Sequence, residues 1–250
     1  MKPKTGSKRL DLVLVDRGLA ESPQKALAMI LAGEVHVNGE RSGKAGMTVA
    51  EDARIEVASR AQKFVSRGGV KLEGALEDFG VDPTGRLCLD IGSSHGGFTD
   101  CLLQRGAARV YAVDVNVDQL DWKLRQDSRV IRIERNARDL RGEDLPEFVS
   151  IVVIDVSFIS VSKVTAPAIA VAGPGADFII LIKPQFELPR EEIAAGGIVT
   201  DKWLHEKAIL AVRVEIESLG LDCIGVRPSG LLGAEGNQEY FLHARKKTMG

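Results

Sequence analysis

The sequence lacks the long apolar runs of a membrane protein. Its longest unbroken apolar stretch covers residues 26–32, far short of the roughly 20 residues that a membrane helix needs. Lys2, Lys4 and Lys8 come near the start, but no apolar segment follows them as it would in a secretory signal. We therefore expect a cytoplasmic protein without a membrane span.

Cysteine and histidine are scarce as well. Cys88, Cys101 and Cys223 form no Cys-x-x-Cys pair, and the four histidines are scattered along the chain. Zinc ligands usually come in short, regular spacings. The sequence therefore predicts no metal site, and it predicts free thiols in a reducing compartment.

Neither sign of charge dominates the chain, whose formal net charge is -2, and its 44% of hydrophobic residues is ample for a packed core. The two parts of the chain differ, however. Residues 1–71 carry 13 Lys and Arg against 8 Asp and Glu, whereas residues 72–250 carry 20 against 27. The front of the chain is therefore its basic part.

Residues 1–58 predict a small α+β domain. Apolar residues recur at helical spacing over residues 10–14 and 26–31, which predicts two short helices. Residues 34–39 then alternate and end in Asn-Gly, a strong hairpin signal. Residues 53–57 supply a closing strand.

A set of residues in this domain matches a known family. The matching pattern is Arg9-Leu10-Asp11, Gly18-Leu19, Ser22, Ala26, Ile30, Gly33, Val35, Val37-Asn38-Gly39 and Lys44. It resembles the S4 domain, whose basic helix face grips RNA phosphates. Pro23 departs from the family, which often has Arg there, and a solvated charged face is the alternative. We assign RNA contacts to Lys8, Arg9, Arg17, Lys25, Lys44 and Arg67.

Residues 70–250 predict a larger α/β domain, joined to the first by a polar, basic linker at residues 59–69. Short apolar runs alternate with helical stretches, as in a mostly parallel sheet. Ligands bind such sheets at the carboxyl ends of the strands. Strands are expected at residues 87–91, 110–113, 130–133, 151–154 and 178–182. Helices are expected around residues 70–79, 98–105, 118–125 and 202–219.

The turn after the first of these strands predicts a cofactor site. Its glycines let the backbone approach a ligand, but Ser94 stands where a nicotinamide enzyme would carry the second glycine of Gly-x-Gly-x-x-Gly. Asp90, at the strand end, suits a ligand with a positive charge and hydroxyls, such as S-adenosylmethionine. The cofactor residues expected in this turn are Asp90, Gly92, Ser93, Ser94, Gly96, Gly97 and Phe98.

Polar residues also follow the next two strands. Asp114 ends the second strand, where a carboxylate commonly accepts hydrogen bonds from ribose hydroxyls, with a simple helix cap as the alternative. Asn136 and Ala137 follow the third strand and are candidate contacts for an adenine edge, with a loop cap as the alternative. We assign all three to the cofactor.

Four charged residues form the candidate catalytic set. Asp155 and Lys183 end the fourth and fifth strands, so we expect both to point into the same crevice. Lys71 lies on the expected helix before the sheet, and Glu239 begins a late apolar stretch. Six strings accompany them: SRGGVKLEGAL, LDIGSSHGGFTD, DVSFIS, IKPQFE, AAGGIVTD and EGNQEYF.

These residues and strings, which span nearly the whole chain, are similar to the TlyA family of RNA ribose methyltransferases, whose catalytic domain is of the FtsJ class. The resemblance implies a Rossmann-like methyltransferase sheet that uses S-adenosylmethionine. It implies 2'-O-methylation of a cytidine in 16S or 23S ribosomal RNA, so the expected partner is ribosomal RNA or a ribosomal subunit. His95 departs from the family, which usually has Thr. The tetrad that the resemblance implies is Lys71, Asp155, Lys183 and Glu239.

The chemistry of the reaction explains such a tetrad. A ribose hydroxyl must lose its proton, or nearly so, as it attacks a methyl group. Our hypothesis makes Lys183 the group that takes or polarises this proton, and makes Lys71 the second cation that disfavours a charge on Lys183. Asp155 and Glu239 hold the lysines in place. The division of roles between the lysines stays open, and structural ion pairs are the alternative.

Two other functions stay open. TlyA relatives have carried the name hemolysin, although no membrane-active segment in the sequence supports a cytolysin. A non-catalytic, ribosome-associated RNA-binding protein would need only the first domain. The sequence indicates no oligomeric state.

Overall fold

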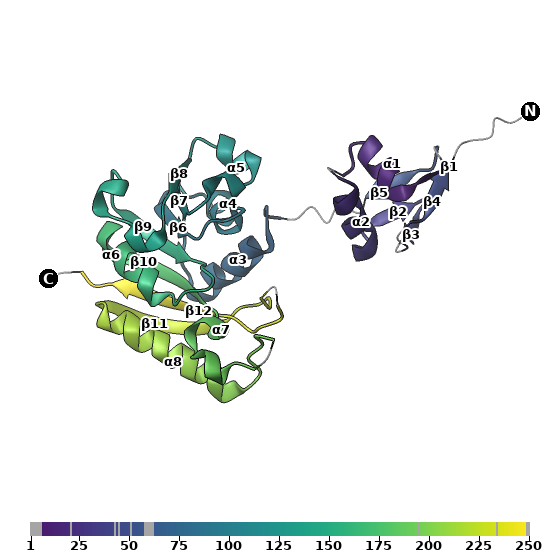
Figure 1. Cartoon of the computed structure of the whole chain (residues 1–250). Coiled ribbons are helices and arrows are strands. Elements are labelled where there is room, and N and C mark those ends of the chain that lie inside the picture. The colour runs from purple at the N-terminus through teal and green to yellow at the C-terminus, as the bar shows by residue number, and fades with distance from the viewer. Residues whose placement is uncertain are drawn as a thin grey trace, which may run out of the picture. The chain divides into compact units, whose positions relative to one another are not determined.

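The computed structural model of the chain describes residues 7–20, 22–42, 44, 46–50, 52–57, 63–194, 196–233 and 235–248. The chain divides into two compact units, residues 1–62 and 63–250 (Figure 1). Of the expected linker, residues 59–62 lie outside the described residues, and residues 67–69 open a helix. No helix within the described ranges combines the length and the apolar character needed to cross a membrane.

The N-terminal unit is a small α+β fold, as predicted. Its elements in chain order are β1 (Ser7–Arg9), α1 (Leu10–Asp16), α2 (Pro23–Ala32), β2 (Val35–Val37), β3 (Glu40–Ser42), β4 (Thr48–Ala50) and β5 (Ile55–Val57). β2 pairs with β3 and β5 in one antiparallel sheet, and β1 pairs with β4, a pair that the sequence did not predict. The core is formed by Leu10, Val13, Leu14, Ala26, Ile30 and Val35.

Local sequence explains two of the turns in this unit. Asn38 and Gly39 have φ angles of 53° and 86°, and both central residues of a type I′ hairpin need positive φ. Ser22 begins α2 by accepting a hydrogen bond from the backbone N–H of Lys25 (3.2 Å), and Pro23 takes the first helical position, which needs no N–H. The departure from the family at Pro23 is therefore compatible with a well-started helix.

The C-terminal unit is built on one seven-stranded sheet. Its strands are β6 (Leu87–Ile91), β7 (Arg109–Asp114), β8 (Val130–Glu134), β9 (Val149–Ile154), β10 (Ala172–Ile182), β11 (Leu221–Pro228) and β12 (Tyr240–Lys246). They lie in the order β11-β12-β10-β9-β6-β7-β8. β12 is antiparallel to both of its neighbours, and the other neighbouring pairs are parallel.

Helices cover both faces of this sheet, as parallel strands require. They are α3 (Arg67–Phe79), α4 (Gly97–Gln104), α5 (Trp122–Gln126), α6 (Ser162–Val171), α7 (Pro184–Glu187) and α8 (Lys202–Ser218), with short 3-10 turns η1 (Val117–Gln119), η2 (Ala137–Asp139), η3 (Gly142–Asp144) and η4 (Arg190–Glu192). Leu89 of β6 packs in the same core as residues of α6 and α8, whereas Cys88 packs with residues of α3 and α4. In Figure 1, α8 runs beside β11.

The central strand β6 opens the site. It lies between β7 and β9, so the chain extends from it first in one direction across the sheet and later in the other. Such a switch point leaves a crevice at the carboxyl ends of the strands. The C-terminal unit therefore has its ligand-binding edge where the glycine-rich turn follows β6.

The five predicted strands of this sheet are confirmed, whereas β11 and β12 were not predicted as strands. The helix expected over residues 118–125 is wrong, because it is interrupted between η1 and α5. Asp121 makes this break by capping α5, where its side chain accepts a hydrogen bond from the backbone N–H of Lys123 (2.9 Å). Helix α3 begins at Arg67, three residues before the expected start.

A buried charge network joins β10 to β12. Asp177 is 5% exposed, and it accepts hydrogen bonds from His243 (3.0 Å), Arg245 (3.0 Å) and Arg86 (2.9 Å). Burial by itself raises the pKa of this carboxyl, but the hydrogen bonds from His243, Arg86 and Arg245 outweigh burial and lower the pKa to about 2. The ionised form of Asp177 therefore stabilises the fold.

Replacing Asp177 tests this network. We expect Asp177→Asn to lower the free energy of unfolding at pH 7 by about 2 kcal/mol, because the partly exposed Arg86 and Arg245 lose hydrogen bonds to an ionised, buried acceptor. A carboxyl whose pKa is lower in the folded state contributes stability above its ordinary pKa and loses it as the pH falls. The difference between the two proteins in urea unfolding should therefore shrink from pH 5 to pH 3. An unchanged difference would contradict this role.

Candidate active site

Two adjoining cavities lie at the carboxyl ends of the central strands. The larger has a volume of about 740 Å³ and the smaller about 250 Å³. Gly92, Ser94 and Asp155 line both. The turn after β6 and the end of β9 thus form the boundary that the two cavities share.

Glycines in this turn allow two close backbone contacts. Gly92 has φ +82°, and a Cβ placed on it would lie 2.1 Å from the backbone oxygen of Asp155. Gly96 has φ +92°, and a Cβ there would lie 2.2 Å from Leu124 Cδ1. No L side chain fits either place without moving its neighbours, so these two glycines are required by the fold of the turn itself.

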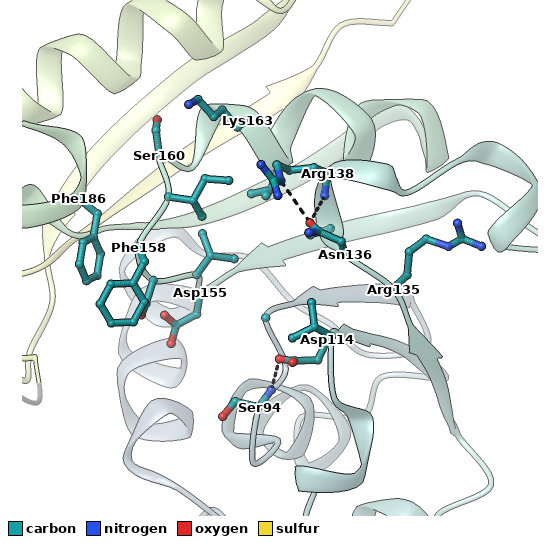
Figure 2. Close-up of a pocket in the computed structure, with 17 residues that line it drawn as sticks. Ser94, Asp114, Arg135, Asn136, Arg138, Asp155, Phe158, Ser160, Lys163 and Phe186 are labelled. Atoms are coloured by element: carbon teal, nitrogen blue, oxygen red, sulfur yellow. Dashed lines mark hydrogen bonds between the residues drawn. The ribbon is translucent and has the colours of Figure 1, made fainter.

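Asp114, at the end of β7, stands over the turn. One carboxylate oxygen accepts a hydrogen bond from the backbone N–H of Ser94 (2.9 Å), and the other accepts one from that of Asn116 (3.1 Å). Figure 2 shows the Ser94 contact beside the larger cavity, which Asp114 lines. The carboxylate thus fixes the turn and still faces the cavity.

Asn136 and Ala137 line the same cavity. The Asn136 side-chain oxygen accepts a hydrogen bond from the backbone N–H of Arg138 (3.1 Å) and caps η2 (Figure 2). Asn136 therefore acts as a loop cap, which was the alternative to a cofactor contact that the sequence left open. Arg135, Arg138 and Lys163 lie on the same cavity wall, and they are basic residues that the sequence did not place in the site.

Asp90 has a different environment from the other expected cofactor residues. It lines neither cavity, is fully buried, and accepts a hydrogen bond from Thr99 Oγ1 (2.6 Å). Burial raises its pKa to about 7, against the effect of the Thr99 hydrogen bond. Asp90 therefore holds α4 in place through its contact with Thr99. Gly96 lines neither cavity, whereas Ser93, Gly97 and Phe98 line the smaller one.

The four residues of the expected tetrad all line the smaller cavity. Lys71 Nζ lies 2.5 Å from Glu239 Oε2, and Lys183 Nζ lies 2.6 Å from Asp155 Oδ1. The lysine side chains are 11% and 13% exposed, and the carboxylates are 4% and 26% exposed. The structure thus brings together residues from α3, the ends of β9 and β10, and the start of β12.

Lys183 has a second partner that sequence reasoning missed. Its ammonium donates a hydrogen bond to Ser157 Oγ (3.0 Å), two residues beyond its carboxylate partner Asp155. The string DVSFIS contains both residues, so the signal was present, but a serine in a loop has many ordinary roles. The pair of contacts fixes the direction in which the Lys183 ammonium points.

Two aromatic rings at the larger cavity were also missed. Phe158 is 88% exposed and has φ +65°, a backbone conformation that costs a non-glycine residue roughly 1–2 kcal/mol. Its ring centroid lies 5.0 Å from that of Phe186, and Figure 2 shows the two rings side by side. An exposed ring in a strained loop at the opening of a cavity is a candidate for contact with a flat ligand.

The residues assigned to RNA fall into two groups. In the N-terminal unit, Lys8 pairs with Asp16, Arg9 pairs with Asp11 (2.7 Å) and Arg17 donates to the backbone oxygen of Ala53 (2.8 Å). Lys25 and Lys44 are exposed there. In the C-terminal unit, Arg67 is exposed, lines the smaller cavity and donates to the backbone oxygen of Leu232 (3.2 Å).

Comparison with known proteins identifies the family. The family model of the FtsJ-like methyltransferases matches residues 64–246, and that of the S4 domain matches residues 8–55. The chain is 44% identical over 242 residues to the 16S/23S rRNA (cytidine-2'-O)-methyltransferase TlyA of Mycobacterium tuberculosis, which covers 96% of this chain and 90% of that protein. This chain belongs to the TlyA family of FtsJ-like methyltransferases.

Solved structures agree with this family. A hemolysin-named protein from Streptococcus thermophilus is 37% identical and matches with a TM-score of 0.76 over 97% of this chain and 90% of that one. A protein from Listeria monocytogenes described as an S-adenosylmethionine-dependent methyltransferase is 14% identical, with a TM-score of 0.53 over 73% of this chain and 100% of that one. This second likeness shows the fold alone.

S-adenosylmethionine is the cofactor of this TlyA-family protein, and the larger cavity fits it. The carboxylates of Asp114 and Asp155 in the cavity wall suit a ligand with a cationic centre and hydroxyls better than a pyrophosphate. The buried Ser93 hydroxyl, which lines the smaller cavity, has no hydrogen-bond partner among the described residues. Those residues contain no group of three or more metal-ligating side chains.

Adding a methyl group to the turn tests the cofactor site. We expect Gly92→Ala to destabilise the fold by more than about 1 kcal/mol, because φ is positive and the new Cβ meets a backbone oxygen. S-adenosylmethionine affinity, measured by calorimetry, should fall at least about tenfold, the change that a misplacement worth 1.4 kcal/mol would produce.

Gly74 provides the matched control. It lies in α3, is exposed, and a Cβ there would meet no atom within 4 Å. Gly74→Ala should stabilise the fold by about 0.5–1 kcal/mol and leave cofactor affinity unchanged. Wild-type cofactor affinity in Gly92→Ala would contradict the placement of the cofactor at this turn.

Proposed function

We propose that this protein methylates the ribose 2'-hydroxyl of a cytidine in ribosomal RNA, within the small or the large subunit. The observation that carries the proposal is the smaller cavity, in which two lysine–carboxylate pairs lie beside the cavity that fits S-adenosylmethionine. The TlyA of Mycobacterium tuberculosis, named for cytidine 2'-O-methylation of 16S and 23S rRNA, supports the substrate. A ribosomal substrate would place the protein in the cytoplasm.

The cofactor residues that we propose are those that line the larger cavity. Asp114 would accept hydrogen bonds from ribose hydroxyls with the lone pairs that its backbone donors leave free. When bound, S-adenosylmethionine supplies an electrophilic methyl group. The full set is Gly92, Ser94, Asp114, Asn136 and Ala137, with Ser93, Gly97 and Phe98 on the side of the smaller cavity and Asp90 as the support of α4.

Lys183 is placed to take the proton of the attacking hydroxyl. In its neutral form it accepts that proton, and the ammonium that forms is stabilised by the carboxylate of Asp155 at 2.6 Å. This arrangement resembles the way a buried aspartate supports a histidine base. The hydrogen bond to Ser157 holds the nitrogen in position, so little reorganisation is needed at the moment of transfer.

Lys71 supplies the second cation of the site. Its ion pair with Glu239 is almost closed to water, so its charge is poorly screened within the cavity. The same ammonium can donate a hydrogen bond to the ribose oxygen as negative charge develops there.

Contacts with the RNA come from both units in this proposal. Phe158 offers an exposed ring on which an unstacked base can lie, as in other proteins that recognise splayed bases. The basic face of the N-terminal unit would grip phosphates without reading sequence. The expected partner is therefore structured ribosomal RNA, either free or in a ribosomal subunit.

Removing either lysine tests the mechanism. We expect Lys183→Ala and Lys71→Ala each to lower the rate of methyl transfer to ribosomal subunits by about 10²–10⁴-fold, the usual contribution of a positioned proton-transfer group. The substrate is ribosomes from a strain that lacks this protein, and the modified ribose is mapped in the product RNA.

Calorimetry with S-adenosylmethionine keeps this test specific. Lys71→Ala should bind the cofactor within about threefold of wild type, because Lys71 does not line the larger cavity, whereas Lys183→Ala also removes contacts with the loop that forms its wall. Lys207→Ala, which breaks an ion pair with Glu192 far along the chain, is the matched control and should keep full activity. Wild-type rates in both site variants would end the mechanism, and no cofactor heat in wild type would favour a non-catalytic RNA binder.

Charge reversal in the N-terminal unit tests its role. We expect Lys25→Glu with Lys44→Glu to weaken RNA binding at low salt and to reduce the slope of log K against log salt by roughly 2, because two phosphate contacts are lost. Cofactor affinity should not change. Lys202→Glu, in the first turn of α8 where an acid is favourable, is the control for a charge reversal outside the N-terminal unit. An unchanged salt slope in the double variant would contradict the assignment.

A further inference from the structure

The loop between β9 and α6, residues 155–161, is fastened to the segment after β10, residues 183–187. The first fastening is formed by Lys183, which contacts the start of the loop, and the second by Phe186, whose ring meets the middle of it. A third fastening lies at the end of the loop, and its donor and acceptor have no part in the chemistry proposed above.

The third fastening is a hydrogen bond to Glu187. The backbone N–H of Val161 donates to Glu187 Oε1 (3.0 Å), and the neighbouring Ser160 hydroxyl bonds that of Ser162 (2.9 Å). Val161 is the N-cap residue of α6, and its own side chain provides no cap. A carboxylate from another element thus satisfies a donor at a helix N-terminus, where negative charge is favoured.

Apart from its hydrogen bond with Val161, the surroundings of Glu187 disfavour its ionised form. Burial raises its pKa, and the hydrogen bond from Val161 acts against that rise. Glu192, five residues on, instead pairs with Lys207 (2.5 Å). Within the described residues Glu187 forms no ion pair, so the hydrogen bond to the loop is what keeps its carboxylate in place.

We infer that Glu187 is a positioning residue that holds the β9–α6 loop in the shape that the active site needs. Glu187 lines neither of the two cavities of the site. The loop that it holds forms one wall of the larger cavity and carries Asp155 and the strained Phe158. Without the third fastening, the loop is free to open at its α6 end, and the strain at Phe158 favours that opening.

The inference rests on the proposed function only for its effect on RNA. The cavity wall and the backbone hydrogen bond exist whatever the substrate is, so loop opening and cofactor binding report on Glu187 without RNA. For the reaction itself, a loosened loop should raise KM for RNA and reduce cofactor affinity, because both ligands are proposed to touch this loop.

Backbone hydrogen exchange measures directly how firmly Glu187 holds the loop. In Glu187→Ala we expect backbone exchange at residues 158–162 to accelerate by at least about tenfold, the change that corresponds to a lost hydrogen bond to a charged group. The dissociation constant of S-adenosylmethionine should rise about three- to tenfold, because it varies as the inverse of the fraction of molecules in which the loop is closed. KM for RNA should rise more than kcat falls.

Two conservative variants separate the effect of side-chain length from the effect of charge. Glu187→Gln keeps a side-chain oxygen at the same distance, so it should restore slow exchange and most of the cofactor affinity. Glu187→Asp keeps the charge but is one methylene shorter, so it should behave like Glu187→Ala. Glu192→Ala is the matched control, and its exchange at residues 158–162 should equal that of wild type.

The outcomes decide the matter without reference to the RNA reaction. Fast exchange and weak cofactor binding in Glu187→Ala and Glu187→Asp, with rescue in Glu187→Gln, support the inference. Wild-type exchange in the folded Glu187→Ala or Glu187→Asp protein overturns it. If Glu187→Ala does not fold, the comparison of Glu187→Gln with Glu187→Asp gives the same decision, and slow exchange in both overturns it.

Discussion

The contact between the backbones of Gly92 and Asp155 is the constraint on which the rest of the site depends. The backbone N–H of Asp155 donates to Ile91 (3.0 Å), and the backbone oxygen of Asp155 faces the space where a Gly92 side chain would stand. The glycine turn that borders the cofactor cavity and the strand end that presents a carboxylate to Lys183 are thereby held in van der Waals contact. A single missing side chain therefore sets the separation between the glycine turn and Asp155.

Much of the fold and of the site was predictable because strong local patterns produced them. Both ends of the strand at residues 87–91 were predicted correctly, because turn residues flank a short apolar run there. The hairpin at Asn38-Gly39 followed from backbone sterics. Lys183 and Asp155 could be expected to meet because polar residues at the ends of neighbouring parallel strands share one edge of a sheet. Lys71 and Glu239 were found only through the resemblance, because no periodicity links residues so far apart.

The features that were missed depend on tertiary packing. The exposure of Phe158 and its positive φ follow from how the loop is held, which no pattern in the string DVSFIS shows. The carboxylate of Asp90 was assigned to the cofactor because it ends a strand, yet the side chain turns inward to Thr99. Likewise, an Asp at position 121 can lie within a helix or begin one, and here it begins α5. Local sequence leaves both choices open.

The position of β12 in the sheet has a consequence for folding during translation. β12 follows the other six strands of this sheet along the chain, yet it lies inside the sheet, between β10 and β11, and Glu239 immediately precedes it. The carboxylate partner of Lys71 therefore arrives only after that strand has left the exit tunnel and inserted between two strands made earlier. Until then the nascent chain carries the Lys71 ammonium without this counter-ion, so the Lys71–Glu239 pair forms only after β12 has entered the sheet.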